Sequence, residues 1–361
     1  MSARPGPVVA DDGDFAARVV AWQRSQGRRG LPWQGQRDPY RVWLSEVMLQ
    51  QTQVATVLDY YPRFLARFPD VAALAAAPLD EVLALWSGLG YYRRARLLHR
   101  CAGVVMAEHG GRFPLDAEQL AALPGIGRST AAAIAAFCAG QRAAILDGNV
   151  KRVLSRALGH GEDLAVARHE RALWVRACAL LPADGADMPA YTQGLMDLGA
   201  TVCLARRPDC PRCPLAETCV ARREGRPEAY PVKTRKLRRS QRESWWLWLE
   251  HDGAVWLQQR PAEGIWAGLW TLPLFDDEAA LDAAAAALGL RAEALPPIDH
   301  ALTHLDWRLH PRRAVAASRP DAEARLGAGR WVARDALATL GLPAPLAKLL
   351  TATSPAPSAP A

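Results

Sequence analysis

The sequence predicts a multi-domain chain in which an all-α region of roughly 200 residues precedes a smaller α+β domain. Three observations support this prediction. The 361 residues are too many for one small core. From Phe15 to about Val220, apolar residues recur at helical spacing between short breaks at Pro and Gly. After a basic stretch, runs rich in Trp and Val replace that spacing.

Composition excludes several classes of protein. Half of the residues are hydrophobic, so the chain can build cores and is not a disordered protein. No apolar run approaches the roughly 18 residues of a membrane-spanning helix. Met1 to Asp14 lacks the apolar segment of a signal peptide. We therefore expect a soluble, cytoplasmic protein.

The net charge of +7 is concentrated in one segment. Between Arg222 and Arg242 there are nine basic and two acidic residues, so the rest of the chain is balanced. Such a concentration suits a polyanion, either nucleic acid or an anionic membrane surface. A solvated linker without a partner is the alternative interpretation.

The expected helices of the first region follow one another with short connections. They cover residues 41–68 with an interruption at Pro62, 79–85, 94–108, 117–123, 130–139, 150–158, 169–181 and 190–202.

The C-terminal region mixes strands and helices. We expect strands at 244–250 and 254–259 joined by a hairpin at 251–253, helices at 280–288 and 335–340, and strands at 307–309 and 314–317. The resulting boundaries are an N-terminal tail over 1–14, the all-α region over 15–221, a basic linker over 222–243, the α+β domain over 244–350 and a disordered tail over 351–361.

Four of the seven cysteines form one cluster. Cys203, Cys210, Cys213 and Cys219 have the spacing C-x6-C-x2-C-x5-C within residues 203–219, which suits a single metal centre. Zinc sites usually show two short pairs, and only one pair is short here, so the spacing favours an iron–sulfur cluster and leaves zinc open. The other three, Cys101, Cys138 and Cys178, are expected to be inert core thiols.

Gly125 and Gly127 lie between two helical segments, in the run Leu-Pro-Gly-Ile-Gly. Glycines allow a backbone to approach a ligand, and the helix that follows offers unpaired N–H groups to an anion. The run therefore predicts either a helix-hairpin-helix that binds a nucleic-acid phosphate or an ordinary turn between helices.

Glu46 lies in a predicted helix between apolar triplets, and Gln50 shares its face. A carboxylate in such surroundings is seldom placed without a partner or a function. Desolvation should raise its pKa, which suits a general acid near neutral pH. The alternative is an exposed helical glutamate.

Asp147 precedes Gly148, Asn149 and the helix that starts at Val150. It is expected to cap that helix, and the helix start should keep the carboxylate ionised. One protonated and one ionised carboxyl group are what cleavage of a glycosidic bond needs.

Taken together, the motifs resemble those of bacterial MutY-type adenine DNA glycosylases, over about residues 15–350. The runs that carry the resemblance are Leu31–Trp33, Trp43–Val54, Gly88–Tyr92, Leu123–Thr130, Ile145–Leu154 and the four-cysteine spacing. The Glu-Val-Met-Leu-Gln-Gln-Thr-Gln run is the most specific, whereas the hairpin and cysteines alone fit the wider endonuclease III superfamily.

The resemblance implies a helix-hairpin-helix glycosylase fold with one 4Fe-4S cluster on the four clustered cysteines. The implied reaction excises adenine mispaired with 8-oxoguanine or guanine in duplex DNA and leaves an abasic site. Flipping is needed because the glycosidic bond is inaccessible inside the base stack. We therefore expect a nucleoid-associated protein with no membrane partner. Because nothing in the sequence suggests an oligomer, we expect a monomer.

The resemblance also implies roles for individual residues. Glu46 protonates the flipped adenine and later helps to activate water, Asp147 stabilises the oxocarbenium-like sugar, and Asn149 holds Asp147 in place. Gln51 and Tyr91 lie at the intercalated gap beside the oxidised guanine. Gln50, Gly125 and Gly127 belong to the implied DNA- and lesion-binding set.

Ser129 bears on the type of reaction. In lyase-type relatives, the matching position holds a lysine that attacks the sugar. Without an amine at this position the usual nucleophile is missing, so we predict a monofunctional glycosylase. Lys151 is the nearest amine within the motifs.

The C-terminal domain resembles the Nudix-like module with which these glycosylases recognise 8-oxoguanine. The acidic signature of a working Nudix hydrolase is absent, so we expect no pyrophosphatase activity. The family's Phe-Ser-His loop is here Leu302, Thr303 and His304. The Thr303 hydroxyl can still form a hydrogen bond, so we expect a preference for 8-oxoguanine.

Three alternatives from other classes remain. The first is an endonuclease III-like glycosylase and lyase that acts on oxidised pyrimidines, against which Ser129 and the C-terminal domain both argue. The second is a non-catalytic binder of damaged DNA, which would not need Glu46. The third is a Nudix nucleotide hydrolase, which the missing acidic signature disfavours.

Overall fold

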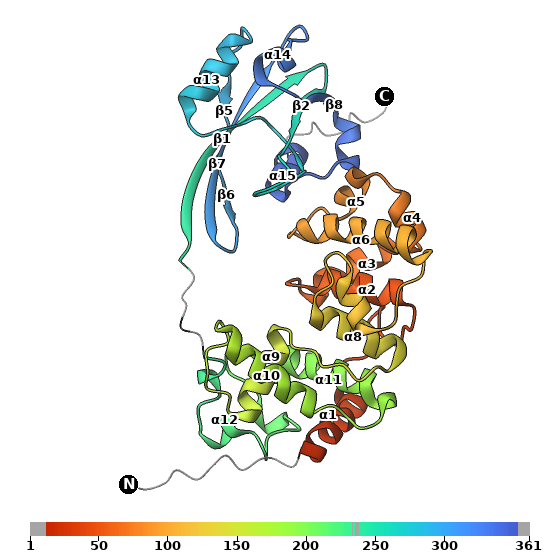
Figure 1. Cartoon of the computed structure of the whole chain (residues 1–361). Helices are drawn as coiled ribbons and strands as arrows, with labels where there is room; N and C mark the ends of the chain where they lie inside the picture. The colour runs from red at the N-terminus through yellow and green to blue at the C-terminus, as the bar shows by residue number, and fades with distance from the viewer. Residues whose placement is uncertain (1–11, 233, 235–237, 353–361) are drawn as a thin grey trace, which may run out of the picture. The chain divides into compact units, whose positions relative to one another are not determined.

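The computed structural model describes residues 12–232, 234 and 238–352 (Figure 1). Most of both expected tails lies outside the described residues. Asp12, which the sequence assigns to the N-terminal tail, instead begins the first helix. Ala352, assigned to the C-terminal tail, ends the last one. Among these described residues, no helix is long and apolar enough to span a membrane.

The chain divides into two compact units, each discontinuous in sequence. Among the described residues, the first unit contains residues 12–75, 100–232 and 234, and the second contains residues 76–99 and 238–352. A segment from within the expected all-α region therefore folds with the C-terminal domain.

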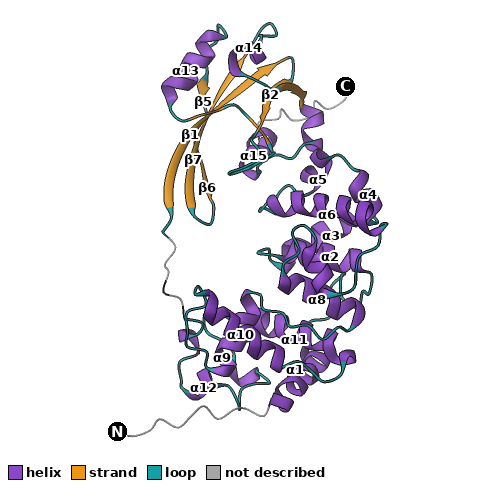
Figure 2. Cartoon of the chain, in the orientation of Figure 1, coloured by secondary structure: helices purple, strands orange, loops and turns teal. Residues whose placement is uncertain are grey.

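The first unit is helical, as expected (Figure 2). Its α-helices are α1 (Asp12–Gln26), α2 (Pro39–Leu49), α3 (Val54–Arg67), α4 (Val71–Ala76), α7 (Ala117–Ala122), α8 (Arg128–Ala139), α9 (Gly148–Leu158), α10 (Ala167–Ala179), α11 (Met188–Thr201) and α12 (Val220–Arg223), while α6 (Arg93–His109) is shared with the second unit. Short 3-10 turns are η1 (Gly185–Asp187), η2 (Cys210–Arg212) and η3 (Pro227–Ala229).

The core of this unit is built around α9 and α11, which pack on each other, and α11 also packs on α1 and α8. Val150 and Leu154 on α9 and Leu195 and Leu198 on α11 lie in one buried apolar cluster. Full burial of such a side chain is worth about 1.5–3 kcal/mol, so this contact fixes the start of α9 firmly. Asp147, immediately before α9, takes its position from that packing.

The predicted interruption at Pro62 is wrong. Pro62 lies inside α3, and the chain instead breaks between α2 and α3, at Gln50–Gln53. Pro62 is exposed, so water can hydrate the carbonyl group that loses its helical hydrogen bond. The actual break contains Gln51 in the left-handed region, with φ of 56°.

The second unit contains an eight-stranded mixed sheet. The strands are β1 (Ser240–His251), β2 (Ala254–Gln259), β3 (Trp270–Thr271), β4 (Leu274–Phe275), β5 (Glu293–Ala294), β6 (Ile298–Ala301), β7 (Leu305–Val315) and β8 (Arg330–Ala333). The helices are α5 (Leu79–Leu85), α13 (Glu278–Ala287), α14 (Ala322–Leu326) and α15 (Ala344–Ala352), and the expected helix at 335–340 is the 3-10 helix η4 (Arg334–Thr339).

Strand β1 is the centre of this sheet. It pairs antiparallel with β2 through the predicted hairpin and parallel with β7 over its whole length, from Ser240 opposite Leu305 onward. The strand expected at 307–309 and the first half of the one expected at 314–317 are therefore parts of the single strand β7, which ends at Val315. Trp246, Leu247, Trp248 and Leu249 are all fully buried, so both faces of β1 are covered.

Residues 76–99 join this unit through specific contacts. A Cβ added at Gly341 would lie 2.6 Å from Cβ of Leu83, so the two backbones approach closely. The Tyr92 hydroxyl donates to the Leu342 carbonyl over 3.0 Å, and the Trp270 indole donates to Asp80 over 3.2 Å.

The expected linker at 222–243 is structured at both ends. Arg223 ends α12, Tyr230 is buried at 7% exposure, and β1 starts at Ser240. Several of its basic residues, Lys233, Arg235 and Lys236, lie outside the described residues.

Candidate active site

The first unit contains a cavity of about 810 Å³, within the size range of small-ligand sites. It brings together six of the predicted site residues, which come from α2, α8 and α9 and the turns beside them. They are Glu46, Gln50, Gln51, Ser129, Asp147 and Asn149. Trp33, from the Leu-Pro-Trp motif, also lines it.

Glu46 is half-buried, on a helix whose other nearby side chains face the core. Asp38 caps this helix by accepting a hydrogen bond from the Tyr40 amide over 2.9 Å. Burial, and to a lesser extent the negative charge of Asp147, raise the pKa of the Glu46 carboxyl to about 8. Glu46 is therefore protonated at neutral pH, as expected for a general acid.

Asp147 is the N-cap of α9. Its Oδ1 accepts hydrogen bonds from the amides of Asn149 over 2.7 Å and Val150 over 2.8 Å. Both donors belong to the first turn of α9, so the Asp147 side chain is held at the helix start. The structure therefore brings the Glu46 carboxyl group and the capped Asp147 side chain to one cavity.

The Asn149 side chain is held from behind by Arg152. The guanidinium donates to Asn149 Oδ1 over 2.9 Å and to the Cys203 carbonyl over 2.8 Å. Gly199 allows this arrangement, because a Cβ there would lie 2.6 Å from Cβ of Asn149. The cavity is thus connected to the cysteine loop through one arginine.

The two glutamines lie where α2 ends. Gln50 donates to the Thr130 hydroxyl over 3.2 Å, which ties the end of α2 to α8. Gln51 is exposed and left-handed, a conformation that costs a residue with a side chain about 1–3 kcal/mol. Such local strain is typical of residues that are positioned for a function.

The hairpin has the geometry expected of an anion site. Gly125 takes φ of 78°, which only glycine adopts without strain. Gly127 caps α8 without a side-chain hydrogen bond, so no cap side chain occupies the amides of the first turn. The Arg128 guanidinium, next in sequence, lies 4.0 Å from the centre of the Trp174 ring.

The positions that bear on strand cleavage hold no amine at the cavity. The Ser129 hydroxyl accepts a hydrogen bond from the Leu146 amide over 2.9 Å. Lys151 lines a different cavity and pairs with Glu170. Among the described residues that line the Glu46 cavity there is no lysine.

The remaining predicted lesion residues lie in the second unit, where two of them meet. The hydroxyl oxygens of Tyr91 and Thr303 are 3.0 Å apart. Tyr91 is exposed and left-handed, with φ of 49°. His304 is exposed, and its carbonyl accepts hydrogen bonds from Ser240.

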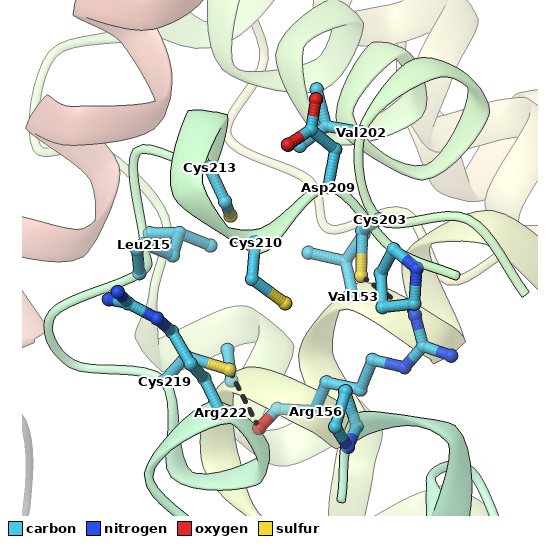
Figure 3. Close-up of a pocket in the computed structure, with 14 residues that line it drawn as sticks. Val153, Arg156, Val202, Cys203, Asp209, Cys210, Cys213, Leu215, Cys219 and Arg222 are labelled. Atoms are coloured by element: carbon cyan, nitrogen blue, oxygen red, sulfur yellow. Dashed lines mark hydrogen bonds between the residues drawn. The ribbon is translucent and has the colours of Figure 1, made fainter. Parts of the chain in front are cut away.

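The four clustered cysteines line one cavity (Figure 3). Arg156 Nη1 lies 3.4 Å from Cys203 Sγ, and the Cys219 thiol donates to the Arg156 carbonyl over 3.4 Å. Burial raises the pKa of Cys213 to about 12, so a free thiolate is disfavoured there unless a metal binds it.

The donor set is four thiols, which suit an iron–sulfur cluster or a zinc ion. Apolar side chains, including Val153, Val202 and Leu215, complete the wall of the cavity. Over the described ranges, no three His, Cys, Asp or Glu side chains are arranged around a position for a single metal ion. Of the other cysteines, Cys101 is buried as expected, but Cys178 is exposed, so its expected place in a core is wrong.

Three residues of the site were missed from the sequence. Arg28 and Gln193 line the Glu46 cavity, and both bond to Asp197, which is fully buried. Asp197 accepts from the Arg28 amide over 2.9 Å, from Arg28 Nε over 2.7 Å and from Gln193 Nε2 over 2.8 Å. An acidic residue within the apolar helix at 190–202 was the available signal.

Comparison with known proteins agrees with this geometry. The model of the HhH-GPD superfamily of base excision DNA repair proteins matches residues 44–177, and that of the NUDIX domain matches residues 244–352. The adenine DNA glycosylase of Buchnera aphidicola is 38% identical over 264 residues, which cover 73% of this chain and 75% of that protein. The chain belongs to the adenine DNA glycosylase family.

Other relatives support this assignment. The Mycobacterium tuberculosis adenine DNA glycosylase is 43% identical over 211 residues, covering 58% of this glycosylase and 68% of the relative. The solved structure of a thermostable thymine-DNA glycosylase matches with a TM-score of 0.52 and 28% identity, covering 59% of this chain and 97% of that one.

The family resemblance and the fold class stated from the motifs are thereby confirmed. The glycosylase is a DNA N-glycosylase of base excision repair, and DNA is its substrate.

Proposed function

We propose that this enzyme excises adenine opposite 8-oxoguanine or guanine in duplex DNA and leaves an abasic site without cutting the strand. The observation that carries the proposal is the pairing of protonated Glu46 with the capped carboxylate of Asp147 at one cavity, with no lysine in its lining. Acid and carboxylate together suit a dissociative cleavage of the glycosidic bond.

The proposed reaction starts when a flipped adenine enters the cavity. The Glu46 carboxyl group donates its proton to a ring nitrogen of the base, and the electron pair of the glycosidic bond leaves with the base. The sugar becomes an oxocarbenium-like cation that the Asp147 carboxylate stabilises. Water then adds to the sugar, and the Glu46 carboxylate accepts the proton that the water loses.

The structural surroundings of the first-unit residues support the roles proposed for them. Asn149, anchored by Arg152, restrains the start of α9 and so the Asp147 carboxylate. The uncapped start of α8 at Gly127 is suited to a DNA phosphate. Gln51, Tyr91, Thr303 and His304 are the proposed contacts to the orphaned guanine. We further propose that one chain acts alone, as a monomer.

Single-turnover base release from a duplex with one adenine opposite 8-oxoguanine tests the function, with strand breaks scored before and after alkali. We expect adenine release and breaks only after alkali. Breaks without alkali would indicate a lyase, and the next substrate would be an oxidised pyrimidine. Binding without release would indicate a damage-binding protein.

The pH dependence of base release follows from the raised pKa of Glu46. Because the acid works only when protonated, the single-turnover rate should stay level near pH 7 and fall by about tenfold per pH unit above pH 8. Rates measured from about pH 6 to 10 at saturating enzyme check this. A rate that rises through pH 8 would contradict the role of Glu46 as acid.

We propose that the cysteine loop holds one 4Fe-4S cluster, on Cys203, Cys210, Cys213 and Cys219. When bound, such a cluster would form iron–thiolate bonds to the four cysteines, and these bonds would hold the loop together. The apolar wall and the buried guanidinium of Arg156 suit a desolvated anionic cluster.

Metal analysis distinguishes this cluster from zinc. The purified chain should contain about four iron atoms and about four inorganic sulfides, rather than one zinc ion. Cys213→Ser should lose most of the iron and lower the melting temperature, whereas Cys178→Ser, an exposed cysteine outside the loop, should keep both. One zinc per chain would disprove the cluster.

A further inference from the structure

The loop that carries Thr303 is a tight connection between β6 and β7. The Leu302 amide donates to the Leu305 carbonyl over 2.8 Å, which closes the turn. Thr303 and His304 are exposed, and Leu302 is half-buried. An exposed turn of this kind does not by itself hold its side chains in one position.

Two residues that precede or begin β1 hold this loop from the neighbouring strand. Arg239 donates through Nη2 to the Leu302 carbonyl over 2.9 Å and to the Asp306 carboxylate over 2.6 Å. Ser240 donates through its amide to the His304 carbonyl over 3.0 Å and through its hydroxyl over 3.2 Å. The carbonyl groups of both residues that flank Thr303 are therefore fixed from one side.

Readout of 8-oxoguanine requires such restraint. Its N7 carries a hydrogen where guanine has a lone pair, so the two bases differ in donor and acceptor at that atom. A mobile hydroxyl can donate or accept and serves both bases equally. A hydroxyl held in place, here 3.0 Å from the Tyr91 hydroxyl, presents one arrangement before the base arrives and can distinguish them.

We infer that Arg239 is a positioning residue for Thr303 and thereby sets the preference for 8-oxoguanine over guanine. The inference rests on the proposed function of Thr303 as a contact to the oxidised base. The Arg239 guanidinium spans the turn, because its Nη2 donates both to the Leu302 carbonyl before Thr303 and to the Asp306 carboxylate after it. It needs no contact with DNA to have this effect.

The test compares single-turnover base release from adenine opposite 8-oxoguanine with release from adenine opposite guanine. Arg239→Ala should lower the ratio of the two rates by about fivefold, the worth of roughly one hydrogen bond, and leave release opposite guanine unchanged. Arg239→Lys should lower the ratio as well, because the shorter lysine keeps the charge but does not carry a planar guanidinium to both acceptors. Melting temperatures verify that the variants fold.

Arg242→Ala is the matched control. Arg242 lies on β1, three positions after Arg239; its side chain is 42% exposed against 44% for Arg239, and it pairs with Asp276 rather than with the loop. Its loss should leave the ratio unchanged.

Three outcomes overturn the inference. If Arg239→Ala weakens binding to both duplexes equally and Arg239→Lys restores it, Arg239 is a phosphate contact. If Thr303→Ala lowers the ratio and Arg239→Ala does not, the proposed role of Thr303 stands and only the positioning role fails. If Thr303→Ala leaves the ratio unchanged, the proposed role of Thr303 itself is wrong.

Discussion

Glu46→Gln is expected to abolish adenine release while the protein still binds its duplex. Glutamine has the same shape as the protonated acid but no proton to give to the base. General acid–base catalysis contributes roughly 10²- to 10⁴-fold, so the single-turnover rate should fall by at least about 10²-fold. Binding and base release are measured on the same duplex, by titration and by rapid quench.

Glu118→Gln provides the control for this loss. Glu118 is an exposed glutamate in the first turn of α7 and lines none of the cavities described above. Its rate should match that of the wild type. Excision by Glu46→Gln within a few fold of the wild-type rate would disprove the acid role and favour a different proton donor.

We expect Asp147→Asn to have the second large effect on base release. The substitution separates the two roles of this side chain, as a helix cap and as a stabilising negative charge. Asparagine caps helices about as well as aspartate, so the melting temperature should change little. The negative charge that faces the developing sugar cation is lost. Base release should therefore fall by roughly 10²- to 10³-fold, as when a stabilising group is removed from a transition state.

Asp116→Asn is the matched control, since Asp116 caps α7 with the same geometry and accepts from the amides of Glu118 and Gln119. Thermal unfolding and single-turnover excision are measured for both variants. If Asp147→Asn unfolds at a much lower temperature while Asp116→Asn does not, or if its excision rate is normal, Asp147 is only a cap.

The proposed acid and carboxylate could be picked out from the sequence because their signals are local. A carboxyl group among apolar helical neighbours, as at Glu46, indicates burial, and burial raises the pKa of the group. An aspartate directly before a helix, as at Asp147, predicts a helix N-cap. The spacing of the four cysteines alone predicts a shared site. The long amphipathic helices α9 and α11 are predicted by the periodic spacing of their apolar residues.

The rest depends on contacts between residues far apart in sequence. Nothing near Arg28 indicates that Asp197, 169 positions later, holds it at the cavity. Proline inside α3 was misinterpreted because a helix tolerates it where the freed carbonyl group meets water. The pairing of Arg239 with a loop more than sixty residues away depends on the parallel register of β1 and β7, which no local pattern indicates.

A gene fragment that stops in the basic segment would not encode a self-sufficient excision module. Leu83, buried at 1% exposure, would lose its cover at Gly341, and the acceptor of the Tyr92 hydroxyl would be missing. The exposed apolar surface would promote aggregation. In evolutionary terms, the C-terminal domain cannot be exchanged by recombination at the linker alone, because residues 76–99 must be inherited with a partner that matches them.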